Sequence, residues 1–259
     1  MDSKIQILYV YKVDHDLGQN PNPFGDFCTL AYCKGLMRKS IQKYAAKQQR
    51  ANPKLSVRDM GIWVIGIAGS RLGSERYGKL LYAMKVTEIL TFEEYWNDSR
   101  FAYKTQVLSE HERVTIENGD DRKKNYAFWR NNKSRLVSGD NVFNKKDSAT
   151  DYVLVSDVYI YHGNDCRNHD KIFINRFGFS PNDAVRGHRI FSDNRKVADR
   201  PLPPAIITYI LDEFKNAKCL ARPTFSAEGF DYLCSDGLPM LERKDGNENN
   251  PLPKRVRYC

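Results

Sequence analysis

The pattern of apolar and polar positions predicts several strands, joined by polar loops and a few helices. Residues Ile5–Tyr11 form an apolar run rich in β-branched and aromatic side chains, as expected of a buried strand. Gly61–Ser70 and Leu80–Ile89 have the same character, and the polar turn between them predicts a β-hairpin. Tyr152–Tyr161 and the shorter Gly187–Phe191 are the next such runs. This order predicts an α/β or α+β fold with a curved mixed β-sheet on which helices pack.

Three helices are expected around these strands. The first has Thr29 as its expected N-cap and an apolar stripe at spacings of three and four, made of Leu30, Cys33, Met37, Ile41 and Tyr44. A short helix, Phe92–Trp96, follows Thr91, and Glu94 stands at the capping-box position. A third helix begins at Pro203–Pro204 and has a packing face that starts at Ile206.

A polar loop separates the first strand from the first helix. Gly18, Pro21, Pro23 and Gly25 prevent it from continuing the strand or starting the helix. A rigid loop between a strand and a helix can hold polar groups around a small concavity, and this one carries Asp14, His15, Asp16, Asn20 and Asn22. The alternative is that the loop only reverses the chain and Asp16 makes an Asx-turn.

We expect residues 1–235 to form a single globular domain with an excursion at about 100–150. That excursion is polar, charged and weakly periodic. Residues 236–259 are polar and rich in Asn, which predicts a C-terminal tail.

Composition narrows the class of protein. The 259 residues include 41 basic and 32 acidic ones, which gives a formal net charge of +9 and favours polyanion partners. No apolar run is long enough for a membrane span and no leader opens the chain, so we expect a cytoplasmic protein. The 6 cysteines show no C-x-x-C pair, and Gly66 and Gly69 do not form a dinucleotide fingerprint. We therefore expect neither a metal nor a cofactor.

The basic residues fall into two clusters. No acidic residue lies between Phe27 and Arg58, where the cations are Lys34, Arg38, Lys39, Lys43, Lys47, Arg50, Lys54 and Arg58. The second cluster contains Lys123, Lys124 and Arg130, among others, and is interleaved with Tyr126, Phe128 and Trp129. Cations mixed with aromatics are typical of sites that hold phosphates and stack a base, although each cluster alone would also fit a solvated face.

Three motifs resemble one known family. They are N-P-N-P-F-G-x-F-C-T-L-A-x-C-K (Asn20 to Lys34), W-V-I-G-x-A-G-S (Trp63 to Ser70) and V-L-V-S-D-x-Y-x-Y-x-G (Val153 to Gly163). Together they resemble the second of the nucleotide-modification-associated domain families, which are linked to systems that make, read or attack hypermodified DNA bases. The chain departs from that pattern at Gly61-Ile62-Trp63, where relatives carry Gly-Asp-Trp, and in an extra basic segment at about Ser40 to Val57.

Two weaker likenesses point in the same direction. The strands Trp63–Ser70 and Leu81–Ile89 are similar to part of a small, partly closed barrel of the PUA/EVE-like kind that pockets a flipped modified base. Gly18-Gln19-Asn20-Pro21 resembles the water-activating loop of uracil-DNA glycosylases, although four residues of this composition also arise by chance.

The resemblance implies that DNA, in particular phage DNA with modified bases, is the partner. One hypothesis is a DNA glycosylase that flips a hypermodified cytosine-type base and cleaves its N-glycosidic bond in antiviral defence. The alternative is a non-catalytic reader that recruits another effector. A base-modifying transferase would need a cofactor motif that the sequence lacks.

Specific residues are predicted for each role in that site. The expected catalytic residues are Asp16, Asn20, Asn22 and Asp157. The expected base-binding residues are Phe24, Trp63 and Ser70, although aromatic side chains such as Phe24 and Trp63 more often belong to the core. The expected contacts to the nucleic-acid backbone are Lys34, Arg38, Lys39, Lys43, Arg71, Lys123, Lys124 and Arg130.

Overall fold

The fold is taken from a computed structural model. It describes residues 5–14, 16, 21–23, 26–31, 34–101, 128–129, 135–136, 150, 152–168, 172–175, 179–181, 187–198, 200–213, 230–235 and 238–243. Among the helices of these residues, none combines the length and the apolar composition that a membrane crossing needs.

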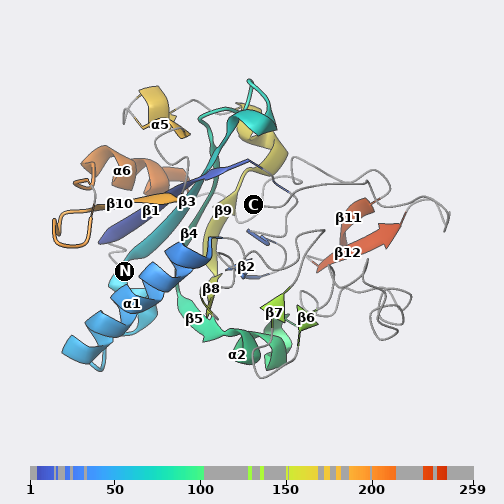
Figure 1. The fold of residues 1–259 in the computed structure, drawn as a ribbon. Coiled ribbons are helices and arrows are strands. Elements are labelled where there is room, and N and C mark those ends of the chain that lie inside the picture. The colour runs from blue at the N-terminus through green and yellow to red at the C-terminus, as the bar shows by residue number, and fades with distance from the viewer. Residues whose placement is uncertain are drawn as a thin grey trace.

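A five-stranded mixed sheet, in the order β10-β1-β3-β4-β9, forms the centre of the fold (Figure 1). Strand β1 (Ile7–Val13) runs parallel to β3 (Ile62–Ala68) and antiparallel to β10 (His188–Ser192). Strand β4 (Leu80–Lys85) pairs antiparallel with β3, which confirms the predicted hairpin, and β9 (Val158–Tyr161) pairs with β4 at the edge.

A second sheet of three antiparallel strands continues from the first. It is made of β2 (Cys28–Leu30), β8 (Tyr152–Ser156) and β5 (Glu88–Thr91), in the order β2-β8-β5. The chain passes from β4 to β5 and from β8 to β9 within two residues each time, so two neighbouring strands bend together from one sheet into the other. The two sheets therefore form one curved surface, which confirms the predicted curved mixed sheet. The described strands do not close into a barrel.

Two predicted strands are thus each divided in two. Leu80–Ile89 is interrupted at Val86 and Thr87, and Tyr152–Tyr161 is interrupted at Asp157. The register explains why both breaks fall at the same level: Lys85 lies opposite Val158 in one sheet, and Glu88 lies opposite Val155 in the other. The expectation that Asp157 lies within a strand was therefore wrong, because it occupies the bend.

Helix α1 (Gly35–Ala51) covers one face of the central sheet. Its buried Met37, Ile41 and Ala45 share a hydrophobic cluster with the odd-numbered side chains of β1, such as Ile7 and Tyr9. The opposite face of β1, with Leu8 and Val10, packs against Ile206 and Ile210 of α6 (Pro204–Glu213). Because successive side chains of a strand point to opposite faces, the two helices cover the two sides of the sheet.

The beginning of α1 differs from the prediction. Thr29 does not cap the helix but lies in β2, where it pairs with Val155 of β8 and forms a bridge with Asn22. These long-range backbone hydrogen bonds outweigh the local preference of Thr for a cap. The helix begins at Gly35, and Lys34 precedes it with a φ of 58° in the left-handed region.

The remaining elements are short. A capping box begins α2 (Phe92–Asn97), as predicted, because Thr91 and Glu94 bond each other's backbone N–H. In the described part of the chain, short 3-10 helices lie at Val57–Met60 (η1), Ser70–Leu72 (η2), Ser99–Phe101 (η3) and Gly163–Asn168 (η5), and α5 covers Ile172–Asn175. The structure also describes two hairpins, β6 (Phe128–Trp129) with β7 (Arg135–Leu136) and β11 (Phe230–Ser235) with β12 (Leu238–Arg243). The last hairpin spans the boundary predicted at residue 236, and where the domain ends stays a prediction.

Candidate functional site

The loop after β1 is fastened to the sheet by two tyrosines of β9. The Tyr161 hydroxyl donates a hydrogen bond of 2.6 Å to Oδ1 of Asp16, and the Tyr159 hydroxyl donates one of 2.6 Å to the Pro23 carbonyl. The two tyrosines are two residues apart, so their side chains leave the same face of the strand. Asp16 is completely buried. The acidic start and the proline-rich end of the loop are therefore both held against the interior.

A second pair of tyrosines continues this polar layer. Tyr82 lies opposite Tyr161 in the β4–β9 ladder, and its hydroxyl donates a 2.7 Å hydrogen bond to the hydroxyl of Tyr11. The Lys34 ammonium lies 5.0 Å from the centre of the Tyr11 ring, within the range of a cation–π contact. Lys34, the residue directly before α1, thus connects the start of the helix to the tyrosine layer.

The strained backbone of Lys34 sets it apart from its neighbours. A non-glycine residue with positive φ costs on the order of 1–2 kcal/mol, and such residues are concentrated at functional sites. Lys34 is the non-glycine residue with positive φ among the described residues. With this backbone conformation the chain enters α1 at Gly35, and the Lys34 ammonium lies over the Tyr11 ring.

The glycines of the W-V-I-G-x-A-G-S motif make room for this layer. A Cβ on Gly66 would lie 2.3 Å from the Tyr82 ring, and one on Gly69 would lie 2.0 Å from Oδ1 of Asp14. Asp14 is in turn paired with Lys12 at 2.8 Å. The motif therefore allows β3 to lie directly beside the tyrosines and the beginning of the loop.

Cys166 lies in the cluster that contains the four tyrosines, but it is not a ready nucleophile. Burial raises the pKa of its thiol to about 12, while nearby Arg76 lowers that pKa and Asp16 raises it. A thiol with this pKa stays protonated at neutral pH, and the thiolate is the reactive form. The chemistry available in this layer is therefore that of a carboxylate and phenolic hydroxyls.

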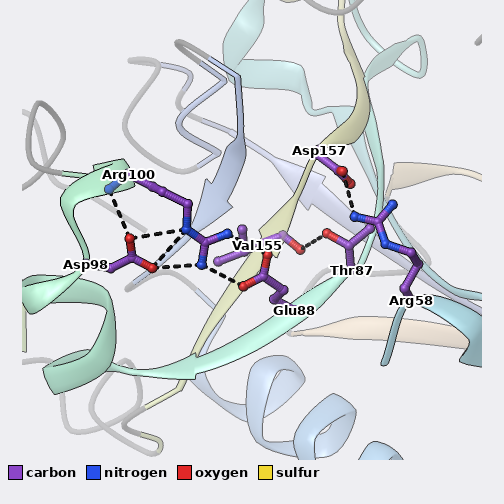
Figure 2. A network of polar contacts seen from close by, with 7 residues as sticks. All are labelled: Arg58, Thr87, Glu88, Asp98, Arg100, Val155 and Asp157. Carbon is purple, nitrogen blue, oxygen red and sulfur yellow. Dashed lines mark hydrogen bonds and ion pairs between the residues drawn. The ribbon is translucent and has the colours of Figure 1, made fainter. Parts of the chain in front are cut away.

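The second predicted carboxylate, Asp157, lies elsewhere, at the bend between the two sheets. Its Oδ2 accepts a 2.6 Å hydrogen bond from Nη2 of Arg58, in η1 (Figure 2). Burial raises the pKa of Asp157, but the hydrogen bond and charge of Arg58 outweigh this effect and the net pKa is lowered. Beside it, Thr87 donates to the Val155 carbonyl at 3.2 Å. Asp157 and Arg58 therefore form a partly exposed ion pair at the bend.

Arg100 forms the other half of the network in Figure 2. Its guanidinium makes two 2.8 Å hydrogen bonds to Glu88 and three hydrogen bonds to Asp98, the shortest of them 2.7 Å. It also lies 5.2 Å from the Phe27 ring centre. The hydrogen bond from Arg100 lowers the pKa of Asp98. Arg100 thereby joins β5 and the end of α2 to Phe27, which directly precedes β2.

Several predicted site residues have interior positions. Arg38 is completely buried, donates to the Tyr152 carbonyl and lies 5.6 Å from the Phe92 ring. Trp63 is 1% exposed and belongs to the cluster on the α6 side of the sheet. Asn22 is half-buried, and its backbone forms two hydrogen bonds with Thr29.

Other predicted residues are exposed or lie outside the described part of the chain. Ser70 and Arg71 are exposed at the start of η2. Asn20, Phe24, Lys123, Lys124 and Arg130 lie outside the described residues. In the described part of the chain, no group of three or more His, Cys, Asp and Glu side chains is arranged to hold a metal ion.

The solvent face of α1 carries a line of cations. Lys39, Lys43, Lys47 and Arg50 are exposed, and they lie within a sector of about 80° around the helix, opposite its buried face. We call these residues the cation row. Among the described carboxylates, none forms an ion pair with a member of the row. The row therefore keeps its full charge directed at the solvent.

The tyrosine layer was not predicted, although the sequence contains a signal for it. Tyr159 and Tyr161 stand in the Y-x-Y of the third motif, and alternation places both on one face of a strand. Two phenols on a buried face need hydrogen-bond partners, and the acidic, proline-rich loop after the first strand contains acceptors for them. The sequence does not indicate which acceptor each tyrosine pairs with.

Comparison with known proteins identifies a family. The model of the nucleotide modification associated domain 2 family matches residues 5–45 and 52–202, which is most of the chain. The interruption, at residues 46–51, lies within α1 and the predicted extra basic segment. No curated protein and no solved structure matches the chain. On the strength of the family match, this chain belongs to the nucleotide modification associated domain 2 family.

Proposed function

We propose that the protein binds DNA and recognises a modified base of the hypermodified cytosine type. The observation that carries the proposal is the cation row on a helix without acidic residues, in a chain whose family is associated with nucleotide modification. Like charges four residues apart on a helix repel each other, so the row costs stability. A phosphate backbone converts that repulsion into attraction and releases counterions on binding.

The proposed backbone contacts differ in part from the predicted set. Lys39 and Lys43 point into solvent and stay in the proposal, together with Lys47 and Arg50. Arg38 leaves it, because its buried guanidinium already bonds the Tyr152 carbonyl. Arg71 is exposed in η2 and stays in the proposal as well.

The chemistry we propose is hydrolysis of the N-glycosidic bond of the flipped base. Water adds to C1′ of the sugar, the bond from C1′ to the base nitrogen breaks, and the base leaves with a proton. Asp16 would stabilise the oxocarbenium-like sugar or accept the proton of the attacking water. Tyr161 supports this assignment, because its hydrogen bond fixes the orientation of the Asp16 carboxylate.

One observation favours the alternative, a reader of modified bases. Asp16 is completely buried, so a sugar can approach it only if the loop residues move. A reader needs no such approach and uses the same cation row. In either case the natural target would be phage DNA with modified bases, encountered in the cytoplasm as part of antiviral defence.

A single incubation separates the two functions. The protein is mixed with duplexes that contain cytosine, hydroxymethylcytosine or glucosylated hydroxymethylcytosine, and half of each sample is treated with alkali, which cleaves abasic sites. Strand breaks at the modified positions support the glycosylase. Retarded but intact modified DNA supports the reader, and absence of both retardation and strand breaks with every duplex refutes both.

Asp16→Asn tests the residue assignment. The variant keeps the shape of the side chain and an acceptor for Tyr161, so we expect DNA binding to persist while base release stops. Asp26→Asn is the matched control, because Asp26 lies in the same loop region but is exposed. Unchanged release by Asp16→Asn removes Asp16 from the mechanism.

A further inference from the structure

One apolar side chain interrupts the polar surface of α1. Leu36 is 60% exposed and is the large hydrophobic residue that stands out to solvent among the described residues. It does not contribute to packing, since Met37, Ile41 and Ala45 fill the opposite side of the helix. A single exposed leucine is ordinary in a protein surface, so the significance of Leu36 depends on its position.

That position is the end of the cation row. At 100° per residue, Leu36 falls in the same sector of the helix as Lys39, Lys43, Lys47 and Arg50. It precedes Lys39 by about 4.5 Å along the axis, and the following lysines rise in steps of about 6 Å. One face of α1 therefore presents an apolar tip followed by a line of cations.

Leu36 is also the member of this face closest in the chain to the tyrosine layer. It is two residues from Lys34, whose ammonium lies over the Tyr11 ring. Tyr11 accepts from Tyr82, which is paired in the sheet with Tyr161, the donor to Asp16. The apolar tip thus lies two residues along the chain from Lys34, which connects α1 to the tyrosine layer.

We infer that Leu36 is the wedge that enters the base stack when DNA lies along α1. The inference rests on the proposed function. Extruding a base leaves a gap in the stack, and proteins that unstack DNA fill such gaps with apolar side chains, leucine among them. The cation row would hold the backbone beside the gap, and burial of Leu36 between bases would stabilise the open form.

The test uses duplexes with 2-aminopurine next to the modified base, because its fluorescence rises when it is unstacked. Binding is followed in parallel by anisotropy at several salt concentrations. We expect wild type to increase the emission and Leu36→Ala to shift the equilibrium between unstacked and stacked DNA back by roughly tenfold, the effect of one lost apolar burial. The salt dependence of binding should stay unchanged, because no cation is removed.

Two further variants make the result specific. Leu36→Phe restores an apolar wedge and should restore the emission, whereas Leu36→Gln keeps the length of the side chain and should not. Emission with Leu36→Ala equal to that of wild type overturns the inference, as does failure of Leu36→Phe to restore it. If wild type binds modified DNA without any rise in emission, the wedge is refuted and DNA binding stands. If wild type binds no DNA, the proposed function fails first.

Discussion

Neutralising the cation row should weaken DNA binding and at the same time stabilise the fold. The perturbation is the triple change Lys39→Gln, Lys43→Gln and Lys47→Gln. Glutamine has a helix propensity close to that of lysine, so the helix itself should be unaffected. All three side chains are exposed, and no described carboxylate pairs with them.

The size of the binding effect follows from the number of cations. If the row contacts four phosphates, the logarithm of the association constant falls with the logarithm of salt concentration with a slope of about −3.6, and the triple variant should retain about −0.9. Between 50 and 200 mM salt, wild type would then lose about 150-fold in affinity and the variant about three- to fourfold. Anisotropy titrations with a fluorescent duplex at four salt concentrations measure both slopes.

The stability effect has the opposite sign. The change removes two like-charge pairs at a spacing of four residues, each of which costs about 0.2–0.5 kcal/mol, so the free energy of unfolding should rise by about 0.5–1 kcal/mol. Urea unfolding measures it. Lys196→Gln is the control, because Lys196 is an exposed cation in a turn after β10 and should change neither quantity. A slope in the triple variant equal to that of wild type would refute the role of the row.

Two further predictions concern stability. Arg100→Ala should lower the free energy of unfolding by about 2 kcal/mol, because it removes partly exposed ion pairs to Glu88 and Asp98 and the stacking of the guanidinium on Phe27 and Phe101. Urea titration of Arg100→Ala and Arg100→Lys measures this, and a loss below about 0.5 kcal/mol in the alanine variant would contradict the role of the network. Burial raises the pKa of Cys166 from 9.0 to about 12, so the folded state keeps a proton that the unfolded state releases. The contribution of the Cys166 thiol to the free energy of unfolding is fully present below pH 9. It falls by up to roughly 4 kcal/mol between pH 9 and pH 12. Unfolding experiments from pH 8 to 11 should show this decline in the free energy of unfolding. The decline should be weaker in Cys166→Ala but not absent, because buried Tyr9, whose pKa is also about 12, still contributes. A wild-type free energy of unfolding that is constant up to pH 11 would refute the prediction.

Local patterns predicted the elements of the fold well where the signal lies within one element. The capping box of α2 and the helix that begins at Pro204 depend on residues a few positions apart, and the β3–β4 hairpin joins two neighbouring apolar runs. The bends at Thr87 and Asp157 could not be predicted in this way, because the apolar pattern continues through them. At the second bend Asp157 pairs with Arg58, which is 99 residues away in the chain, so the contact leaves no local trace in the sequence.

The candidate site was only partly predictable for a similar reason. The charge pattern of α1 revealed the exposed lysines, but counting Arg38 among the backbone contacts overlooked the helical period. Arg38 is three residues before Ile41 and seven before Ala45, which places it on the buried stripe. The sequence also marked Asp16 as chemically interesting, whereas its donor Tyr161 lies 145 residues further along the chain.

The two tyrosines of β9 have a consequence for how the protein could diversify. They fasten the loop at Asp16 and at Pro23, so one strand of the sheet holds both ends of the segment between these anchors. A set of chimaeras that differ in this short segment alone would keep both tyrosine anchors and α1. Under the proposed function, such exchanges are expected to alter which modified base is recognised more than they alter overall stability.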